Sequence, residues 1–106
     1  MVVVVARVRT DAGKREALMR VGQAIAAASR TEAGCISYRM YEDIERENEF
    51  VIVEEWETNE ALQQHFATSH VAEFMRAIPA TIVGPPDVKF HTIASTMDLA
   101  DVSTGP

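Results

Sequence analysis

The alternation of apolar and polar positions divides the chain into strand-like and helix-like segments. Residues 2–8 are β-branched and almost entirely apolar, which is typical of a central strand. Over residues 14–30 the apolar side chains instead recur every three or four positions, as in a helix that lies on a sheet. Residues 31–34 end this helix, and Gly34 suits the left-handed backbone of a helix exit.

Two more strands follow, and the charged turn between them predicts an antiparallel hairpin. The strands cover residues 35–42 and 50–56, and the turn covers residues 43–48. Strict alternation along the first of these strands places Ile36 on the same face as Tyr38.

The second helical segment, residues 58–82, is broken near its middle. Thr58 is placed to cap the first part of this helix, and Ser69 is placed to cap the second part. Pro79 kinks or ends the helix, and a Gly-Pro-Pro sequence then stops it. A final strand is predicted over residues 87–96.

The order strand, helix, strand, strand, helix, strand predicts an α+β fold of the ferredoxin-like βαββαβ type. This fold is a four-stranded antiparallel sheet with both helices on one face. We expect residues 1–96 to form this domain and residues 97–106 to form a tail that docks on a partner subunit. The strands are apolar on both faces, but the helices cover only one. We therefore expect a homodimer in which the sheets of two subunits pack face to face.

Composition narrows the possible classes of function. A chain of 106 residues, 47% of them hydrophobic, suits one domain with a packed core. A net charge of −6 without a basic block argues against nucleic acid or an anionic membrane surface as partner. Cys35 stands alone, which excludes an internal disulfide, and no apolar run approaches a membrane span. We expect a cytoplasmic protein that binds a small molecule.

Four short motifs stand at the ends of these segments. They are EAGC-x-x-Y at residues 32–38, F-x-x-x-E-x-W at residues 50–56, AL-x-x-H at residues 61–65 and SH at residues 69–70. In this order and spacing the chain resembles the antibiotic biosynthesis monooxygenase (ABM) superfamily of dimeric α+β barrels. That superfamily includes cofactor-free quinol and polyketide oxygenases, haem-degrading enzymes and a sugar-phosphate isomerase.

The resemblance implies a pocket in each subunit between the sheet and the helices. Trp56 looks like the tryptophan that the polyketide oxygenases tie to oxidation, although no asparagine of this chain matches theirs. Haem-degrading members carry an asparagine on the first strand and a histidine late in the second helix. This chain has Ala6 or Arg7 and Met75 at those places, so we expect no haem. Carried onto this chain, the pocket lining would include Tyr38, Trp56, His65, Phe66, His70 and Phe74.

The two histidines of the broken helix are the candidate general bases. His65 follows a capped start and could take a proton from a phenol or hydroxyketone; the alternative is a core or surface histidine held by a carbonyl. His70 stands beside a helix start that favours a neutral imidazole; the alternative is a local turn contact. Trp56 and Tyr38 could hold a flat substrate or could anchor a core or an interface.

Glu54 shares a strand face with Trp56, and a buried carboxylate needs a partner. We expect an ion pair with Arg7 or Arg39. His65 and His70 are five residues apart, which is not the spacing of one helix face, so we predict no metal site. The residues expected to contact substrate are Phe66, Phe74, Met75, Glu54 and Arg39.

These patterns lead to one leading hypothesis and two alternatives. The leading one is a cofactor-independent monooxygenase that oxidises a quinol, phenol or polyketide-like aromatic, with molecular oxygen as co-substrate. The first alternative is an isomerase or binding protein for a hydroxyketone or sugar phosphate. Arg7 or Arg39 facing the pocket without an acidic partner would favour it. The second alternative is a dimeric module without catalysis.

Overall fold

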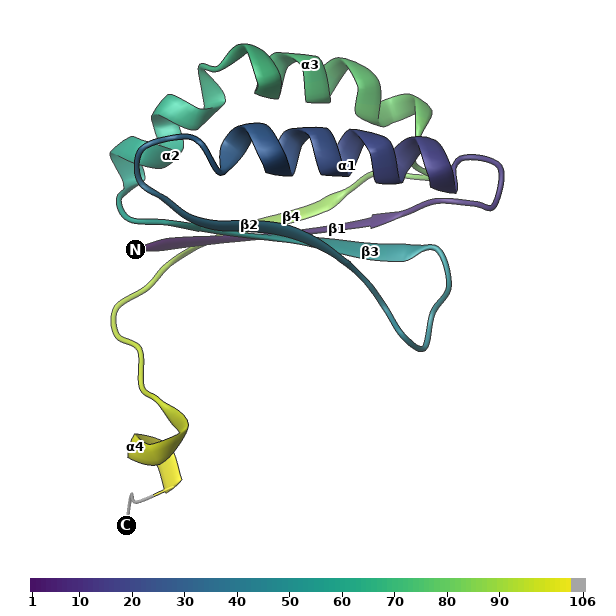
Figure 1. Cartoon of the computed structure of the whole chain (residues 1–106). Coiled ribbons are helices and arrows are strands. Elements are labelled where there is room, and N and C mark those ends of the chain that lie inside the picture. The colour runs from purple at the N-terminus through teal and green to yellow at the C-terminus, as the bar shows by residue number, and fades with distance from the viewer. Residues whose placement is uncertain (104–106) are drawn as a thin grey trace.

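A computed structural model of the protein describes residues 1–103 as a sheet covered on one face by helices (Figure 1). The element order matches the predicted βαββαβ pattern, with the second helix in two parts. None of the described helices is long and apolar enough to cross a membrane. The elements are β1 (Val2–Arg9), α1 (Arg15–Ser29), β2 (Cys35–Glu42), β3 (Glu49–Trp56), α2 (Asn59–Phe66), α3 (Ser69–Ala77), the 3-10 turn η1 (Ile78–Ala80), β4 (Asp87–Thr92) and α4 (Leu99–Ser103).

The four strands form one antiparallel sheet in the order β2-β3-β1-β4. This is the order of a ferredoxin-like fold, so the predicted fold class is confirmed. The register places Val4 of β1 opposite Glu54 of β3, and Glu54 opposite Tyr38 of β2. Because residues paired across an antiparallel sheet share a face, these three side chains all point toward the helices.

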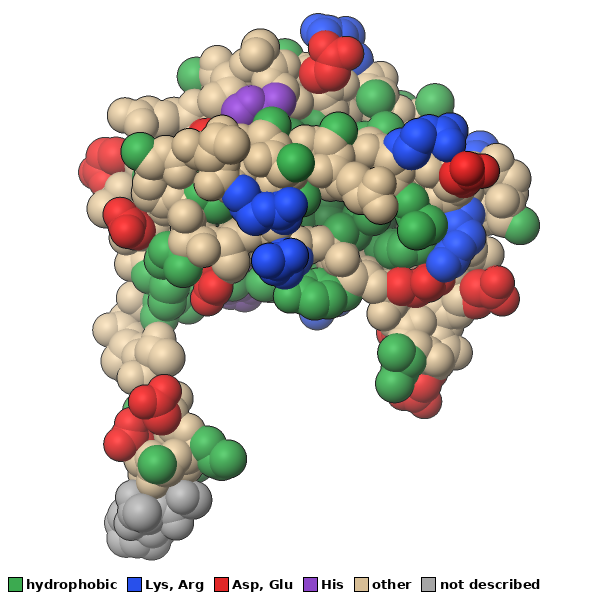
Figure 2. Space-filling view, viewed as in Figure 1, with side chains coloured by type: hydrophobic (Ala, Val, Ile, Leu, Met, Phe, Trp, Pro, Cys, Tyr) green, Lys and Arg blue, Asp and Glu red, His purple; other side chains and the backbone are tan. Residues whose placement is uncertain are grey.

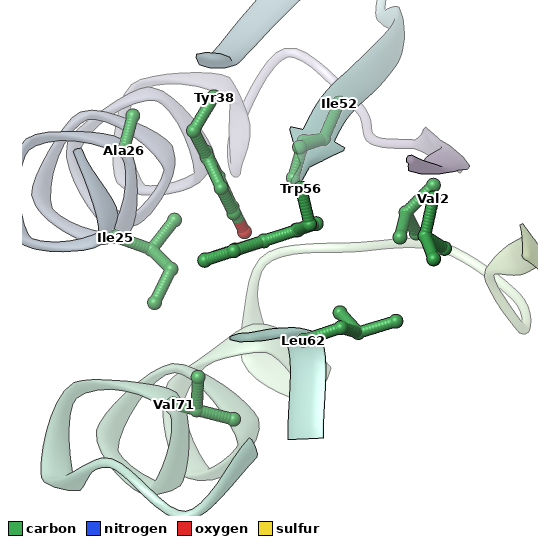
Figure 3. Packing of buried hydrophobic residues seen from close by; sticks show 9 residues of the cluster. Val2, Ile25, Ala26, Tyr38, Ile52, Trp56, Leu62 and Val71 are labelled. Atoms are coloured by element: carbon green, nitrogen blue, oxygen red, sulfur yellow. The ribbon is translucent and has the colours of Figure 1, made fainter. Parts of the chain in front are cut away.

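The core lies between the sheet and the helical layer. Trp56 and Leu18 have no measurable exposure. Figure 3 shows Trp56 lying flat between Tyr38 on one side and Leu62 on the other. The apolar residues packed in the same cluster are Val2, Val4, Ile25, Ala26, Tyr38, Ile52, Leu62 and Val71.

The opposite face of the sheet carries apolar residues that no helix covers. Val3, Val5, Val51 and Val53 remain partly exposed there. The β2–β3 hairpin and the C-terminal segment both extend from the sheet on this side, away from the helices (Figure 1). The face is therefore open and bordered by two projections, and the homodimer remains a prediction.

Three sequence expectations about the strands and the C-terminal tail need correction. Ile36 does not share a face with Tyr38, because a register shift between Cys35 and Ser37 turns it outward, where it is 50% exposed. The last strand ends at Thr92 rather than at residue 96. The tail contains the short helix α4, which the sequence did not indicate, and its residues 104–106 lie outside the described part of the chain.

The break in the second helix is made by threonine caps. Thr58 begins α2, with its hydroxyl accepting from Ala61 N–H at 3.0 Å, as predicted. Thr68, not Ser69, caps α3: its hydroxyl accepts from Val71 N–H at 3.3 Å and donates to the carbonyl of His65 at 2.7 Å. One side chain thus ends one helix and begins the next, which changes the direction of the backbone between the two histidines.

Substitution of Gly34 tests whether the turn after α1 requires a glycine. Its φ of 85° is left-handed, and an added Cβ would lie 2.6 Å from the Cβ of Ala61. We expect Gly34→Ala to lower the free energy of unfolding by about 2–4 kcal/mol, from backbone strain and overlap together. Urea denaturation measures this. The matched control is Gly13→Ala, where the nearest atom is 3.5 Å away. Equal stability of the two variants would contradict the expectation.

Candidate functional site

A single carboxylate oxygen joins the two histidines. Glu32, in the loop after α1, places its Oε2 atom 2.7 Å from Nδ1 of His65 and 2.7 Å from Nε2 of His70. The side chains are 13%, 4% and 26% exposed, respectively. An ionised carboxylate only accepts hydrogen bonds, so both of these ring nitrogens carry hydrogen. The threonine-capped break makes this convergence possible, because five residues on one straight helix would not bring the rings together.

A second buried carboxylate lies on the sheet side of His65. Glu54 Oε1 accepts a hydrogen bond from Trp56 Nε1 at 3.0 Å and lies 3.8 Å from His65 Nε2. The Tyr38 hydroxyl also hydrogen-bonds to Glu54. Burial raises the pKa of Glu54 to about 7, although the hydrogen bonds from Trp56 and Tyr38 oppose this rise. Burial, followed by the charge of Glu54, raises the pKa of Tyr38, so its phenol stays protonated.

Aromatic rings enclose His65. Its ring centroid is 4.5 Å from that of Trp56, 5.8 Å from Tyr38 and 5.7 Å from Phe66. Phe66 itself is half exposed and meets Phe90 of β4 edge-on at 5.9 Å. His65 is therefore a core residue with two polar contacts, and almost none of its side chain is open to solvent.

His70 is the residue through which the cluster reaches the protein surface. It lines a groove of about 410 Å³ between α1 and α3, together with the apolar residues Ile25 and Phe74. Figure 2 shows histidine atoms reaching the surface of the helical layer. The remaining lining residues are Arg20, Val21, Ala24, Ser69, Glu73 and Ala77.

The structure brings together five of the residues singled out from the sequence and places the others around this cluster or away from it. Phe74 lines the groove, whereas Met75 is 62% exposed. Arg39 lines a different groove, of about 460 Å³, between α1 and β2. Phe66 lies at the margin of the cluster against β4. The five that meet, directly or through Glu32, are Tyr38, Glu54, Trp56, His65 and His70.

The predicted ion pair of Glu54 with an arginine is wrong. Arg7 lies opposite Val51 in the sheet, and Arg39 lies opposite Val53, so both start from the face away from the helices. Glu54 starts from the helix-facing side. Its partners are the Trp56 indole and the Tyr38 hydroxyl instead of a cation, and their hydrogen bonds only partly oppose the rise in its pKa that burial causes.

Glu32 is the functional residue that sequence reasoning missed. In the sequence it belongs to the segment that ends the first helix, and it opens the first of the four motifs. Its acidic character was the available signal, but the contact needs the loop to fold back over α2 and α3. Sequence spacing cannot show this, since Glu32 is 33 residues from His65 and 38 from His70.

The same three residues could hold a metal ion. Within the part of the chain that the structure describes, Glu32, His65 and His70 form such a group, with ligand atoms all within 4.8 Å of one another. Ligands around a tetrahedral cation lie roughly 3.3 Å apart, as bonds of about 2 Å require. The observed contacts of 2.7 Å are hydrogen bonds, and a cation would have to separate them. The absence of a metal site remains a prediction.

Fold and site together define a small ferredoxin-like α+β domain with a buried carboxylate–imidazole cluster that opens onto a surface groove. The model of the antibiotic biosynthesis monooxygenase family matches residues 1–77. The chain therefore belongs to this family, as the resemblance of its motifs indicated.

Proteins of several bacteria are similar to this chain in sequence or in fold. The uncharacterised protein sll1783 of Synechocystis is 35% identical over 98 residues, which is 92% of this chain and 67% of that protein. The Bacillus subtilis protein named "Putative monooxygenase YcnE" is 31% identical over 88 residues, 83% of this chain and 93% of that protein. The structure of Rv0793 from Mycobacterium tuberculosis is 26% identical with a TM-score of 0.84, covering 92% of this chain and 98% of that one.

The pKa of Glu54 predicts how stability depends on pH. Because folding raises the pKa from 4.5 to about 7, the folded protein binds the proton more tightly than the unfolded chain. The contribution of Glu54 to stability is then greatest below about pH 4.5, falls as the pH rises to about 7 and is level above that. We expect Glu54→Gln to remove this fall of about 3 kcal/mol.

Urea denaturation of both proteins at several pH values between about 4.5 and 8 measures the difference. Glu55→Gln is the matched control, because Glu55 is the next residue along β3 but points to the other sheet face, where it accepts from Ser37 at 2.6 Å. Parallel pH curves for the Glu54 variant and the unsubstituted protein would contradict the prediction.

Proposed function

We propose that this protein is a cofactor-independent monooxygenase that oxidises a phenol, quinol or polyketide-like aromatic with molecular oxygen. The observation that carries the proposal is the Glu32-bridged pair of imidazoles beside an apolar groove. A base held by a carboxylate next to an apolar cavity suits removal of a proton from an aromatic hydroxyl. Membership of the family, and the name of the relative in Bacillus subtilis, agree with this reaction class.

The reaction balances without a further reductant. An imidazole takes the hydroxyl proton, and the phenolate transfers one electron to dioxygen. Superoxide then joins the ring carbon as a peroxide, which takes up a proton. Loss of the proton from that carbon breaks the O–O bond and expels hydroxide, which becomes water. In total a phenol and dioxygen give a quinone and water, so the substrate supplies all four electrons.

In this scheme the protein deprotonates the substrate, orients it and excludes water from it. The electron-rich substrate anion reacts with dioxygen itself, so the scheme needs no haem, metal or flavin. Buried side chains support the orientation, because His65 and Trp56 are fixed by hydrogen bonds to carboxylates as well as by packing.

We further propose that the working form is a homodimer in which the open sheet faces of two copies meet. Four valines on this face remain partly exposed in one copy. The C-terminal segment leaves the sheet on the same side (Figure 1), and its Leu99 and Val102 are exposed in one copy. A second copy on the sheet face would lie beside this segment and could cover both side chains.

Oxygen uptake by metal-free protein tests the proposed reaction. We expect chelator-treated protein to consume oxygen with members of a panel of quinols and phenols. His65→Ala and His70→Ala should each lower the rate at least about 100-fold, because the base or its support is lost. Gln64→Ala, at an exposed neighbouring position, should keep the rate. Activity that needs added metal, or no uptake with any substrate, would contradict the proposal.

Light scattering after size-exclusion chromatography tests the dimer. We expect the unsubstituted protein to elute with twice the mass of one chain. Val53→Glu should give a monomer, because it puts a charge in the centre of the buried face. Gln63→Glu adds the same charge at an exposed position of α2 and should leave the dimer intact. A monomeric unsubstituted protein, or a dimer that survives Val53→Glu, would contradict the proposed interface.

One observation supports a second candidate function. Arg39 lines the groove between α1 and β2 together with Arg30 and Glu42. Glu42 forms its ion pair with Arg15, and within the described residues Arg39 has no ion-pair partner. This arrangement suits an anionic ligand such as a sugar phosphate. Neither His65 nor His70 lines that groove, so it lacks the base that an isomerase needs. The second candidate is therefore binding of an anion, and calorimetric titration with sugar phosphates, using Arg39→Gln as comparison, distinguishes it.

A further inference from the structure

We propose that His70 alone takes the proton from the substrate, at its Nδ1 atom, and that the aromatic ring lies in the groove between α1 and α3 instead of in the core beside Trp56. This inference rests on the function proposed above. It names the base, the reacting atom and the place of the substrate, and it gives Glu32 and His65 supporting roles.

Hydrogen bonding fixes which nitrogen of each ring is free. The Glu32 oxygen accepts from Nδ1 of His65 and from Nε2 of His70, so each neutral ring keeps its lone pair on the other nitrogen. The lone pair of His65 is on Nε2, which faces Glu54 at 3.8 Å. The lone pair of His70 is on Nδ1, and no group in the described part of the chain hydrogen-bonds to it.

The imidazole rings of His65 and His70 differ in how accessible they are to a substrate. The His65 side chain is 4% exposed and is enclosed by aromatic rings, with Trp56 the nearest at 4.5 Å. A substrate could reach it only if the core opened. The His70 side chain is 26% exposed and already lines a groove. The available acceptor is therefore Nδ1 of His70.

The groove has the size and chemistry for a flat aromatic ligand. Its volume of about 410 Å³ lies within the range of small-molecule sites. Val21, Ile25 and Phe74 supply apolar walls from two helices. The charged side chains along it are Arg20 and Glu73, each of which forms a surface ion pair on its own helix. An aromatic body would thus meet apolar walls, and its hydroxyl would meet His70.

Glu32 is a positioning residue in this arrangement. When the substrate O–H bond breaks and an N–H bond forms at Nδ1, His70 becomes an imidazolium whose charge is met by the carboxylate 2.7 Å away. His65 donates to the same oxygen and so holds the carboxylate in place without touching the substrate. The phenolate stays in the groove and keeps the electron pair for reaction with dioxygen.

A chromophoric phenol tests the base without any oxygen chemistry. 4-Nitrophenol absorbs at different wavelengths as phenol and as phenolate, so its spectrum under nitrogen reports proton transfer to the protein. We expect the protein to bind it as phenolate about one pH unit below its solution pKa, where most of the free phenol is neutral. His70→Ala should bind it as neutral phenol, and added imidazole should restore ionisation by filling the space.

Two further variants, Glu32→Gln and His65→Ala, test the supporting roles of these residues, because neither residue contacts the ligand in the proposed arrangement. Glu32→Gln should lower the ionised fraction and reduce kcat at least about 10-fold with little change in KM. Imidazole should not rescue His65→Ala, because that space is closed from the groove. The inference is overturned if His70→Ala ionises the bound phenol as well as the unsubstituted protein does.

The position of the ligand is tested separately. Ala24→Trp fills the groove from α1 and should abolish 4-nitrophenol binding, whereas Ala27→Trp, exposed on the same helix but outside the groove, should not. Equal binding by both variants, or no binding by the unsubstituted protein, overturns the placement. Ionised phenol without oxygen uptake would uphold the base assignment and overturn the oxygenase function, so the two failures are distinguishable.

Discussion

The contact on which the rest of the site depends is one carboxylate oxygen shared by two imidazoles. For Glu32 to reach both rings, the second helix must break between them, and Thr68 makes that break by serving both helices. The loop after α1 must also turn back, which the left-handed Gly34 allows. Helix caps and a glycine turn therefore have a chemical consequence, because they set the tautomers and the exposure of two histidines.

The core of this protein is polar at its centre, and this distinguishes the site from ordinary packing. Glu54 lies among apolar side chains with only an indole and a phenol as hydrogen-bond donors, so burial raises its pKa to about 7. If this position served stability alone, an apolar residue in place of the carboxylate would raise the free energy of unfolding. The buried carboxylate supports His65, which in turn supports Glu32, so the cost in stability is consistent with a functional cluster.

The two sheet faces have different roles. The helix-facing side holds the cluster, and the open side holds partly exposed valines. The hairpin and the C-terminal segment extend from the sheet on the open side (Figure 1). Because the strands separate these faces by simple alternation, residues of the open face proposed for self-association can change without disturbing the site. The same alternation explains why Arg7 and Arg39 could not reach Glu54.

The sequence by itself determined the strands, the helices, the helix break and the fold class, because these follow from local periodicity and capping. It also identified Trp56, Glu54 and both histidines as residues of interest. Only the tertiary structure decided that Glu32 joins the histidines, that a bulge turns Ile36 outward and that Glu54 pairs with an indole. These contacts link residues far apart in the chain, and their geometry depends on how loops and helices pack, which no local pattern encodes.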